Sequence, residues 1–168
     1  MRRPFFAAAF LALAVSLAGC ASGPKPEVAP SPITNSAGTW TFAFDAGPGI
    51  ASATLSGRDG RPDLRITCQA PRGDLMITDW TFSRARQGEV QATVSVGSAS
   101  KTVSARIEGD GAGRQALMAA LAPTDQVFAA LTPSAPIRTV ASGYTHNWAP
   151  GAASRINDVI NACRSIGS

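Results

Sequence analysis

The sequence contains a single histidine, His146, and this limits the chemistry that the chain can perform. Acid–base catalysis or metal binding through an imidazole would depend on that one residue. Four aspartates could supply a carboxylate partner or a catalytic pair: Asp59, Asp63, Asp74 and Asp79. They lie in or beside expected turns, where aspartate commonly bonds to its own backbone. We therefore expect no catalytic residues, and a hydrolase that uses His146 with an acidic partner is an alternative.

Sequence motifs of known catalytic and metal sites are also missing. The chain has no Gly-x-Ser-x-Gly, no His-Glu-x-x-His and no aspartate-rich calcium loop. Residues 109–113 are rich in glycine, but the Lys-Ser/Thr pair of a phosphate-binding loop does not follow them. We interpret this segment as a flexible connection, and we expect neither a cofactor nor a metal ion.

One group of aromatic residues could bind a ligand. Tyr144, His146 and Trp148 alternate with polar residues, so an extended backbone would place all three rings on one face. Such rings can stack on a sugar or anchor a protein partner, because they bury a large area and keep hydrogen-bonding groups. The same rings could instead cover one end of the hydrophobic core. Both interpretations stay open, and a glycan-binding or small-ligand-binding protein is a second alternative function.

Hydrophobic periodicity predicts the strands that would position these residues. Apolar side chains alternate with other residues along five segments, at residues 39–44, 51–55, 64–68, 89–96 and 101–107, and residues 75–82 are apolar on both faces, which predicts a sixth strand covered on both sides. Turn-forming residues rich in glycine, proline and aspartate separate most of the segments. Six consecutive strands with short connections indicate an antiparallel meander.

The last third of the chain has a different pattern. Residues 114–121 are rich in Ala, Leu and Met and are followed by a proline, which predicts a helix. A short helical turn should follow near Val127, and residues 136–142 should form a strand. Residues 152–166 carry apolar side chains at helical spacing and predict a terminal helix. The expected fold class is α+β, an antiparallel sheet or small sandwich of six to seven strands with C-terminal helices.

The N-terminus has the pattern of an export signal. Arg2 and Arg3 precede an apolar stretch at residues 5–15, which is shorter than the roughly 20 residues that a spanning helix needs. The stretch ends in Leu-Ala-Gly-Cys at residues 17–20. Small residues before a cysteine resemble the lipobox of bacterial lipoprotein signal peptides. An ordinary secretory signal is the alternative, and the arginine pair also leaves twin-arginine export open.

The lipoprotein resemblance implies a membrane anchor and a location. Cleavage would fall before Cys20, which would carry the lipid. Residues 1–19 would be the signal peptide, 20–37 a proline-rich flexible tether, and 38–168 a single globular domain. In similar Gram-negative lipoproteins an aspartate after the cysteine favours retention in the inner membrane. Ala21 stands there instead, so we expect a lipid-anchored protein of the cell envelope, in the outer membrane and facing the periplasm.

The two remaining cysteines, Cys68 and Cys163, form an even pair in an oxidising compartment. We expect a disulfide between them, and two buried free thiols are the alternative. Closing a loop of about 95 residues would stabilise the fold by roughly 4 to 5 kcal/mol in the chain-entropy model. The layout, with a tryptophan in the first strand and cysteines on a central strand and the last helix, resembles small proteobacterial periplasmic proteins of unknown role.

Charge argues against nucleic acid as a partner. Without Arg2 and Arg3 the mature chain has 13 basic and 11 acidic residues, and no run of Lys or Arg occurs in it. We expect a non-enzymatic binding or scaffolding module for envelope assembly, secretion or host interaction. Its expected partners are the membrane, through the N-terminal lipid, and an envelope protein or polymer.

Overall fold

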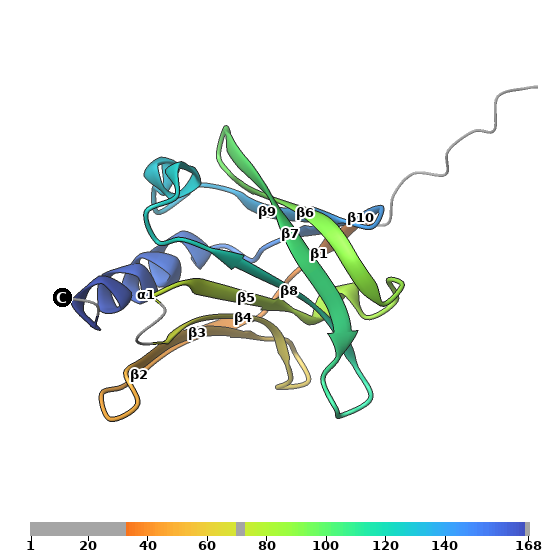
Figure 1. Ribbon diagram of the computed structural model, residues 1–168, viewed down its shortest axis with the longest axis horizontal. Helices are drawn as coiled ribbons and strands as arrows, with labels where there is room; N and C mark the ends of the chain where they lie inside the picture. The colour runs from red at the N-terminus through yellow and green to blue at the C-terminus, as the bar shows by residue number, and fades with distance from the viewer. Residues whose placement is uncertain (1–32, 70–72, 167–168) are drawn as a thin grey trace, which may run out of the picture.

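The computed structural model describes residues 33–69 and 73–166. These residues form one ten-stranded sheet, two short 3-10 helices and a C-terminal α-helix (Figure 1). The strands are β1 (Ile33–Asn35), β2 (Thr39–Asp45), β3 (Ile50–Ser56), β4 (Pro62–Gln69), β5 (Leu75–Asp79), β6 (Gly88–Val96), β7 (Ala99–Gly109), β8 (Gln115–Leu121), β9 (Ile137–Ala141) and β10 (Tyr144–Asn147). The helical segments are η1 (Trp80–Phe82), η2 (Gln126–Ala130) and α1 (Ala152–Ile166).

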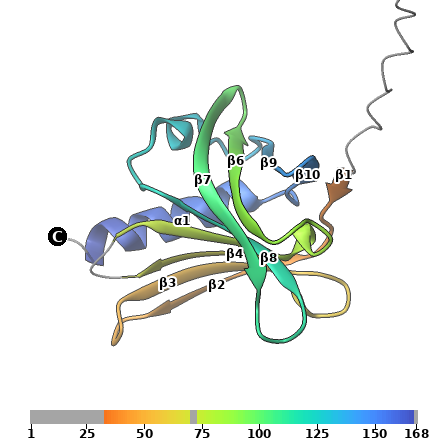
Figure 2. The same cartoon turned by 45° about the vertical axis from the view of Figure 1, so that its right-hand side comes forward.

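The sheet is strongly curled and its two edges belong to neighbouring parts of the chain. The strand order is β1-β10-β9-β6-β7-β8-β5-β4-β3-β2, and every pair is antiparallel except β1 with β10. The edge strands β1 and β2 are joined by residues 36–38 alone, so the sheet bends round into a half-barrel (Figures 1 and 2). Gly38 lies in this junction, and a Cβ there would be 2.0 Å from the carbonyl oxygen of Ser56. Close backbone approach therefore requires glycine at this position.

The hydrophobic core fills the inside of the curl. Inward side chains from β3, β4, β5 and β8 are fully buried, among them Leu55, Leu64, Ile77 and Leu117. Helix α1 packs on this face against β2, β3 and β4 (Figure 1). Its apolar side recurs at helical spacing and consists of Ala152, Ala153, Ile156, Val159, Ile160 and Cys163.

The predicted disulfide is confirmed. Cys68 on β4 and Cys163 on α1 are bonded, with their Cα atoms 5.7 Å apart. Both cysteines are buried in the core. The bond closes a sequence separation of 95 residues and fixes the last helix to the middle of the sheet. A bond that spans so much of the chain restricts the unfolded ensemble strongly, which is the main way disulfides stabilise a fold.

Several predicted elements are confirmed, and the fold is mixed but mostly β. The terminal helix has the bounds expected from its periodicity, residues 152–166, and the strand predicted at 136–142 is β9. The sheet has ten strands rather than six to seven, and it is one curled sheet rather than two packed ones. The prediction of several C-terminal helices was also wrong, because α1 is accompanied there by only the 3-10 turn η2 among the described residues.

The helix predicted at 114–121 is a strand. β8 pairs with β5 on one side and β7 on the other, and its residues Leu117, Ala119 and Leu121 point into the core. Pairing on both sides satisfies the backbone and outweighs the helix propensity of Ala, Leu and Met. The insertion of β8 next to β5 also breaks the expected meander, since β5 does not pair with β6.

The N-terminal predictions lie mainly outside the described residues. The signal peptide at 1–19 and Cys20 fall in that part of the chain. Strand β1 lies within the stretch that we assigned to the tether, and it pairs with β10. In the part of the chain that the structure describes, no helix is both long and apolar enough to cross a bilayer.

Candidate functional site

Three residues distant in the sequence form a hydrogen-bonded network inside the curl, where β1 meets β10. The Nδ1 atom of His146 lies 2.6 Å from Oδ2 of Asp79. Its other ring nitrogen, Nε2, bonds to the hydroxyl oxygen of Ser36. Asp79 and His146 are 0% and 1% exposed, whereas Ser36 is half-buried. The network therefore runs from a buried carboxylate toward the surface.

Each member is held by the secondary structure around it. Asp79 ends β5 and caps η1, so its second oxygen, Oδ1, accepts hydrogen bonds from the backbone N–H and the hydroxyl of Thr81, at 3.0 and 2.6 Å. His146 lies on β10, opposite the buried Thr139 of β9. Ser36 follows β1, and its N–H donates to the carbonyl of Asn147 at 3.0 Å. The pairing of β1 with β10 thus brings the serine to the imidazole.

A carboxylate, an imidazole and a hydroxyl bonded in this order can support nucleophilic catalysis. A carboxylate on Nδ1 fixes the orientation of the ring and stabilises the imidazolium, which leaves Nε2 free to take a proton from a hydroxyl. The same arrangement also satisfies three polar groups in a core, which any folded protein requires of buried polar atoms. These two roles, proton transfer and the satisfaction of buried polar groups, make different predictions when Ser36 is substituted.

Sequence reasoning identified part of this network. It named His146 and included Asp79 among four possible acidic partners, but it missed Ser36. Nothing in the local pattern distinguishes that serine, because it lies in a stretch assigned to the tether. The signal that could have found it is the pairing of β1 with β10, which sequence periodicity does not report.

The predicted ligand residues lie mainly in the interior. Trp148 is 7% exposed, and its indole N–H donates to the hydroxyl of Thr139 at 3.0 Å. Tyr144 is half-buried, packs edge-on against Phe82 and donates its hydroxyl hydrogen to a backbone carbonyl of Arg84 at 3.2 Å. With His146 buried as well, the three rings contribute to the core side of the sheet. The three rings therefore do not form one exposed face.

Charged residues lie close to the network. Partial burial and the nearby carboxylate of Asp59 raise the pKa of Asp63 above its ordinary value, although the neighbouring His146 and Arg114 act in the opposite direction. The effect of His146 on this carboxyl places Asp63 within electrostatic reach of the imidazole. Asp63 and the neighbouring Asp59 therefore place negative charge near the network, and Arg114 partly offsets it.

An exposed aromatic row follows the sheet edge at β2. Trp40, Phe42 and Phe44 lie opposite Leu55, Ala53 and Ala51 of β3, so they share the face that carries α1. Phe42 is 37% exposed and Phe44 is 50% exposed, while Trp40 is half-buried. No strand in the described part of the chain pairs with the outer side of β2. The edge thus combines exposed rings with an unpaired backbone.

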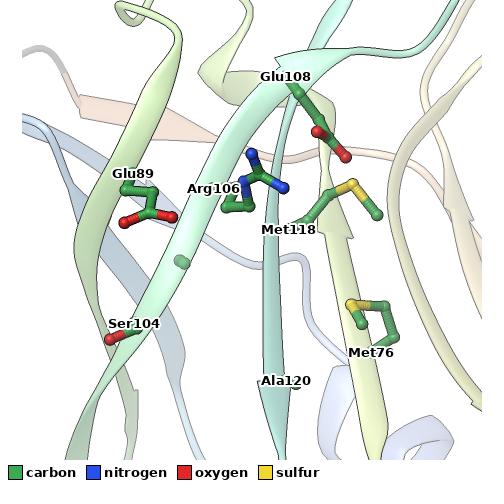
Figure 3. Close-up of a pocket in the computed structure, with 8 residues that line it drawn as sticks. Met76, Glu89, Ser104, Arg106, Glu108, Met118 and Ala120 are labelled. Atoms are coloured by element: carbon green, nitrogen blue, oxygen red, sulfur yellow. The ribbon is translucent and has the colours of Figure 1, made fainter.

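A shallow hollow of 360 Å³ lies on the opposite, outer face of the sheet (Figure 3). Its apolar part comes from Met76 on β5 and from Met118 and Ala120 on β8. Arg106 and Glu108 on β7 lie beside them in the close-up, and no salt bridge joins these two side chains. The hollow is separate from the buried network, which points into the curl.

Comparison of the chain with known protein families, curated proteins and solved structures gives no match. The class of protein is therefore defined by its own geometry: a curled antiparallel half-barrel with a disulfide-fixed terminal helix. Within the described residues, no group of three or more His, Cys, Asp or Glu side chains could hold a metal ion. Two regions are candidate functional sites: the Asp79–His146–Ser36 network and the exposed aromatic edge of β2.

Proposed function

We propose that the protein is a lipoprotein of the cell envelope that acts as a binding or scaffolding module, and that its partner docks along β2. The observation that carries this proposal is the exposure of Phe42 and Phe44 on a strand whose outer edge is unpaired. Exposed apolar rings and free strand edges are normally covered or blocked, because they promote association.

The residues of β2 leave its edge open to pairing. Natural sheets protect edge strands with lysine, proline or a bulge. β2 contains no lysine or proline, its only charged residue is Asp45, and its register with β3 is regular along its whole length. A protein segment in extended conformation could therefore add to this edge through its backbone.

The spacing of the rings indicates the chemistry of the partner. Phe42 and Phe44 are two residues apart, so their rings follow each other at about 7 Å along the strand. An extended segment with apolar side chains at alternate positions would match both the rings and the free backbone groups. We accordingly propose a protein partner in the envelope rather than a polysaccharide, which offers no strand backbone.

The proposed anchor would supply the location. A lipid on Cys20 would confine the domain to a membrane face, and the proline-rich segment after it would set how far the domain reaches. Confinement raises the effective concentration of the domain near envelope partners, so that a modest contact area suffices.

Site-specific photocrosslinking in living cells tests the proposal. The full chain carries p-benzoylphenylalanine at position 44, and the crosslinked product is identified by mass spectrometry. The matched control carries the same group at Ala112, an exposed position in the loop between β7 and β8. We expect one abundant envelope protein to be captured from position 44 and not from position 112. Equal capture from both positions, or none from either, would refute docking along β2.

The anchor is tested separately on the same purified chain. Mass spectrometry of the N-terminal peptide should show a diacylated Cys20 as the first residue. An unmodified cysteine within a longer chain would contradict the lipoprotein assignment while leaving the docking result intact.

A further inference from the structure

The geometry points to a second activity: we infer that Ser36 is the nucleophile of an esterase centre, with His146 as its general base and Asp79 as the residue that orients the imidazole. This inference goes beyond the binding function, and it replaces the expectation that the chain has no catalytic residues. It rests on the Asp79–His146–Ser36 network alone and does not depend on β2.

The atoms that bond are those that nucleophilic catalysis requires. The carboxylate is on Nδ1, so that nitrogen carries the hydrogen and Nε2 presents its lone pair to the serine hydroxyl. The hydrogen bonds from Thr81 to the other carboxylate oxygen hold the Asp79 side chain in place. A network that only satisfied buried groups could use either ring nitrogen for the carboxylate.

Ser36 is placed where a substrate could reach it. It is half-buried in the connection between the two sheet edges, and the next residue, Ala37, is exposed. The N–H of Ala37 has no hydrogen-bond acceptor among the described residues. A free backbone N–H directly after a nucleophile can donate to the oxyanion that forms on the substrate.

The acidic surroundings indicate the class of substrate. Asp59 and Asp63 are neighbours, since a Cβ on Gly57 would lie 3.3 Å from Oδ1 of Asp59 and 2.8 Å from Oδ2 of Asp63. Asp63 is also within electrostatic range of His146. An anionic substrate would be repelled, whereas a neutral carboxylic ester would not. The alcohol part of an ester leaves as an alkoxide, and the imidazolium of the single base can supply the one proton that it needs.

The proposed reaction has two balanced steps. The Ser36 oxygen attacks the ester carbonyl while its proton moves to Nε2, and the C–O bond to the alcohol then breaks as Nε2 returns the proton to the leaving oxygen. Water attacks the resulting acyl-serine, giving its proton to Nε2, and the carboxylic acid leaves as Ser36 regains its hydrogen. No oxidant, metal or other co-reactant is needed.

A fluorophosphonate probe tests the inference on the intact folded protein. Such a probe phosphonylates a serine only when a base activates the hydroxyl. We expect a covalent adduct on the Ser36 peptide, formed at least about 100-fold faster than on any other serine of the chain. Ser56→Ala, at another half-buried serine nearby, is the matched control and should label as fast as the unsubstituted protein.

Further measurements separate catalysis from a structural role. Ser36→Ala should abolish the adduct and the hydrolysis of 4-nitrophenyl acetate, while its circular dichroism spectrum and β2 crosslinking stay unchanged. Absence of an adduct from folded, unsubstituted protein, under conditions that label a known serine esterase, would overturn the inference. An adduct that persists in Ser36→Ala would also overturn it, because the reactive serine would then lie elsewhere.

Discussion

The buried network and the exposed edge of β2 both take residues from one short stretch of chain, yet the polar groups of the network are bonded within the fold and the edge of β2 is exposed. Ser36 enters the curl and completes a chain of polar partners. Eight residues later Phe44 is half-exposed on β2, whose outer side pairs with no strand among the described residues. The side chains of the network bond to one another, whereas the outer backbone groups of β2 pair with no strand in the described part of the chain. Under the two proposals above, the network would carry the chemistry and the edge of β2 would recognise the partner.

The largest expected effect comes from breaking the network at its centre. His146→Ala would remove the ring that bonds to Oδ2 of the buried Asp79 and leave only the bonds from Thr81 to Oδ1, which should cost about 3 kcal/mol or more. Urea denaturation should show a loss of about this size. Ser36→Ala is the control and should cost only about 1 kcal/mol, because Ser36 lies at the half-exposed end. A loss under 1 kcal/mol for His146→Ala would contradict a closed buried network.

A smaller loss is expected at the junction between the two regions. Gly38→Ala would place a Cβ against the carbonyl of Ser56, so the backbone between β1 and β2 would have to shift. Such overpacking commonly costs about 1–3 kcal/mol. Gly47→Ala, at a loop position where the new Cβ would be 3.5 Å from its nearest neighbour, is the comparison. Equal thermal stability of the two variants would show that the junction is looser than described.

A substitution at the exposed edge of β2 should change the stability of the fold much less than one in the buried network. Phe44→Lys replaces a half-exposed ring on an unpaired strand, so the free energy of unfolding should change by about 0.5 kcal/mol or less. Urea denaturation of the unsubstituted protein and of Phe44→Lys, run in parallel, measures the difference in the free energy of unfolding. A loss above 2 kcal/mol would mean that the ring belongs to the core rather than to a docking surface.

The smallest effect concerns the acidic surroundings of the network. Because the pKa of Asp63 is raised in the folded state, its contribution favours folding below its ordinary value of 3.8 and is lost as pH rises through the folded value. Asp63→Asn should therefore increase Tm at pH 7 and leave it almost unchanged near pH 3. The effect should stay well under about 0.5 kcal/mol, since solvent screens this partly exposed carboxyl.

Asp110 provides a control of opposite sign. Backbone N–H groups, that of Arg114 first, lower the pKa of this exposed carboxyl. Its contribution is present above pH 3.8 and is lost as pH falls through the folded value. Asp110→Asn should accordingly lower Tm slightly at pH 7. The same sign for both variants would contradict the electrostatic interpretation.

Sequence periodicity predicted the faces of the strands well and their pairing poorly. Alternation along β3 and β4 correctly placed Cys68 inside, and helical spacing correctly placed Cys163, so the disulfide could be predicted. The same alternation could not show that β5 pairs with β8, because it reports faces and not neighbours. Residues 114–121 were mispredicted for this reason, since pairing on both sides overrode their helix propensity.

The residues of the candidate site could likewise be predicted from the sequence only in part. His146 could be singled out because it is the only histidine, and Asp79 because few carboxylates were available. Ser36 could not, since a three-residue strand such as β1 leaves almost no periodic signal. The exposure of Phe42 and Phe44 was also unpredictable, because alternation marks an aromatic face without showing whether another strand or helix covers it.

The most direct test of docking along β2 combines one crosslinker with one substitution. p-Benzoylphenylalanine replaces Phe42 in the full-length protein, and the yield of the crosslinked product in living cells is compared with and without Phe44→Lys. We expect the substitution to reduce the yield at least about tenfold, corresponding to 1.4 kcal/mol or more of binding free energy, while the unfolding midpoint stays unchanged. An undiminished yield would contradict the account, because the partner would then bind without contacting the aromatic edge.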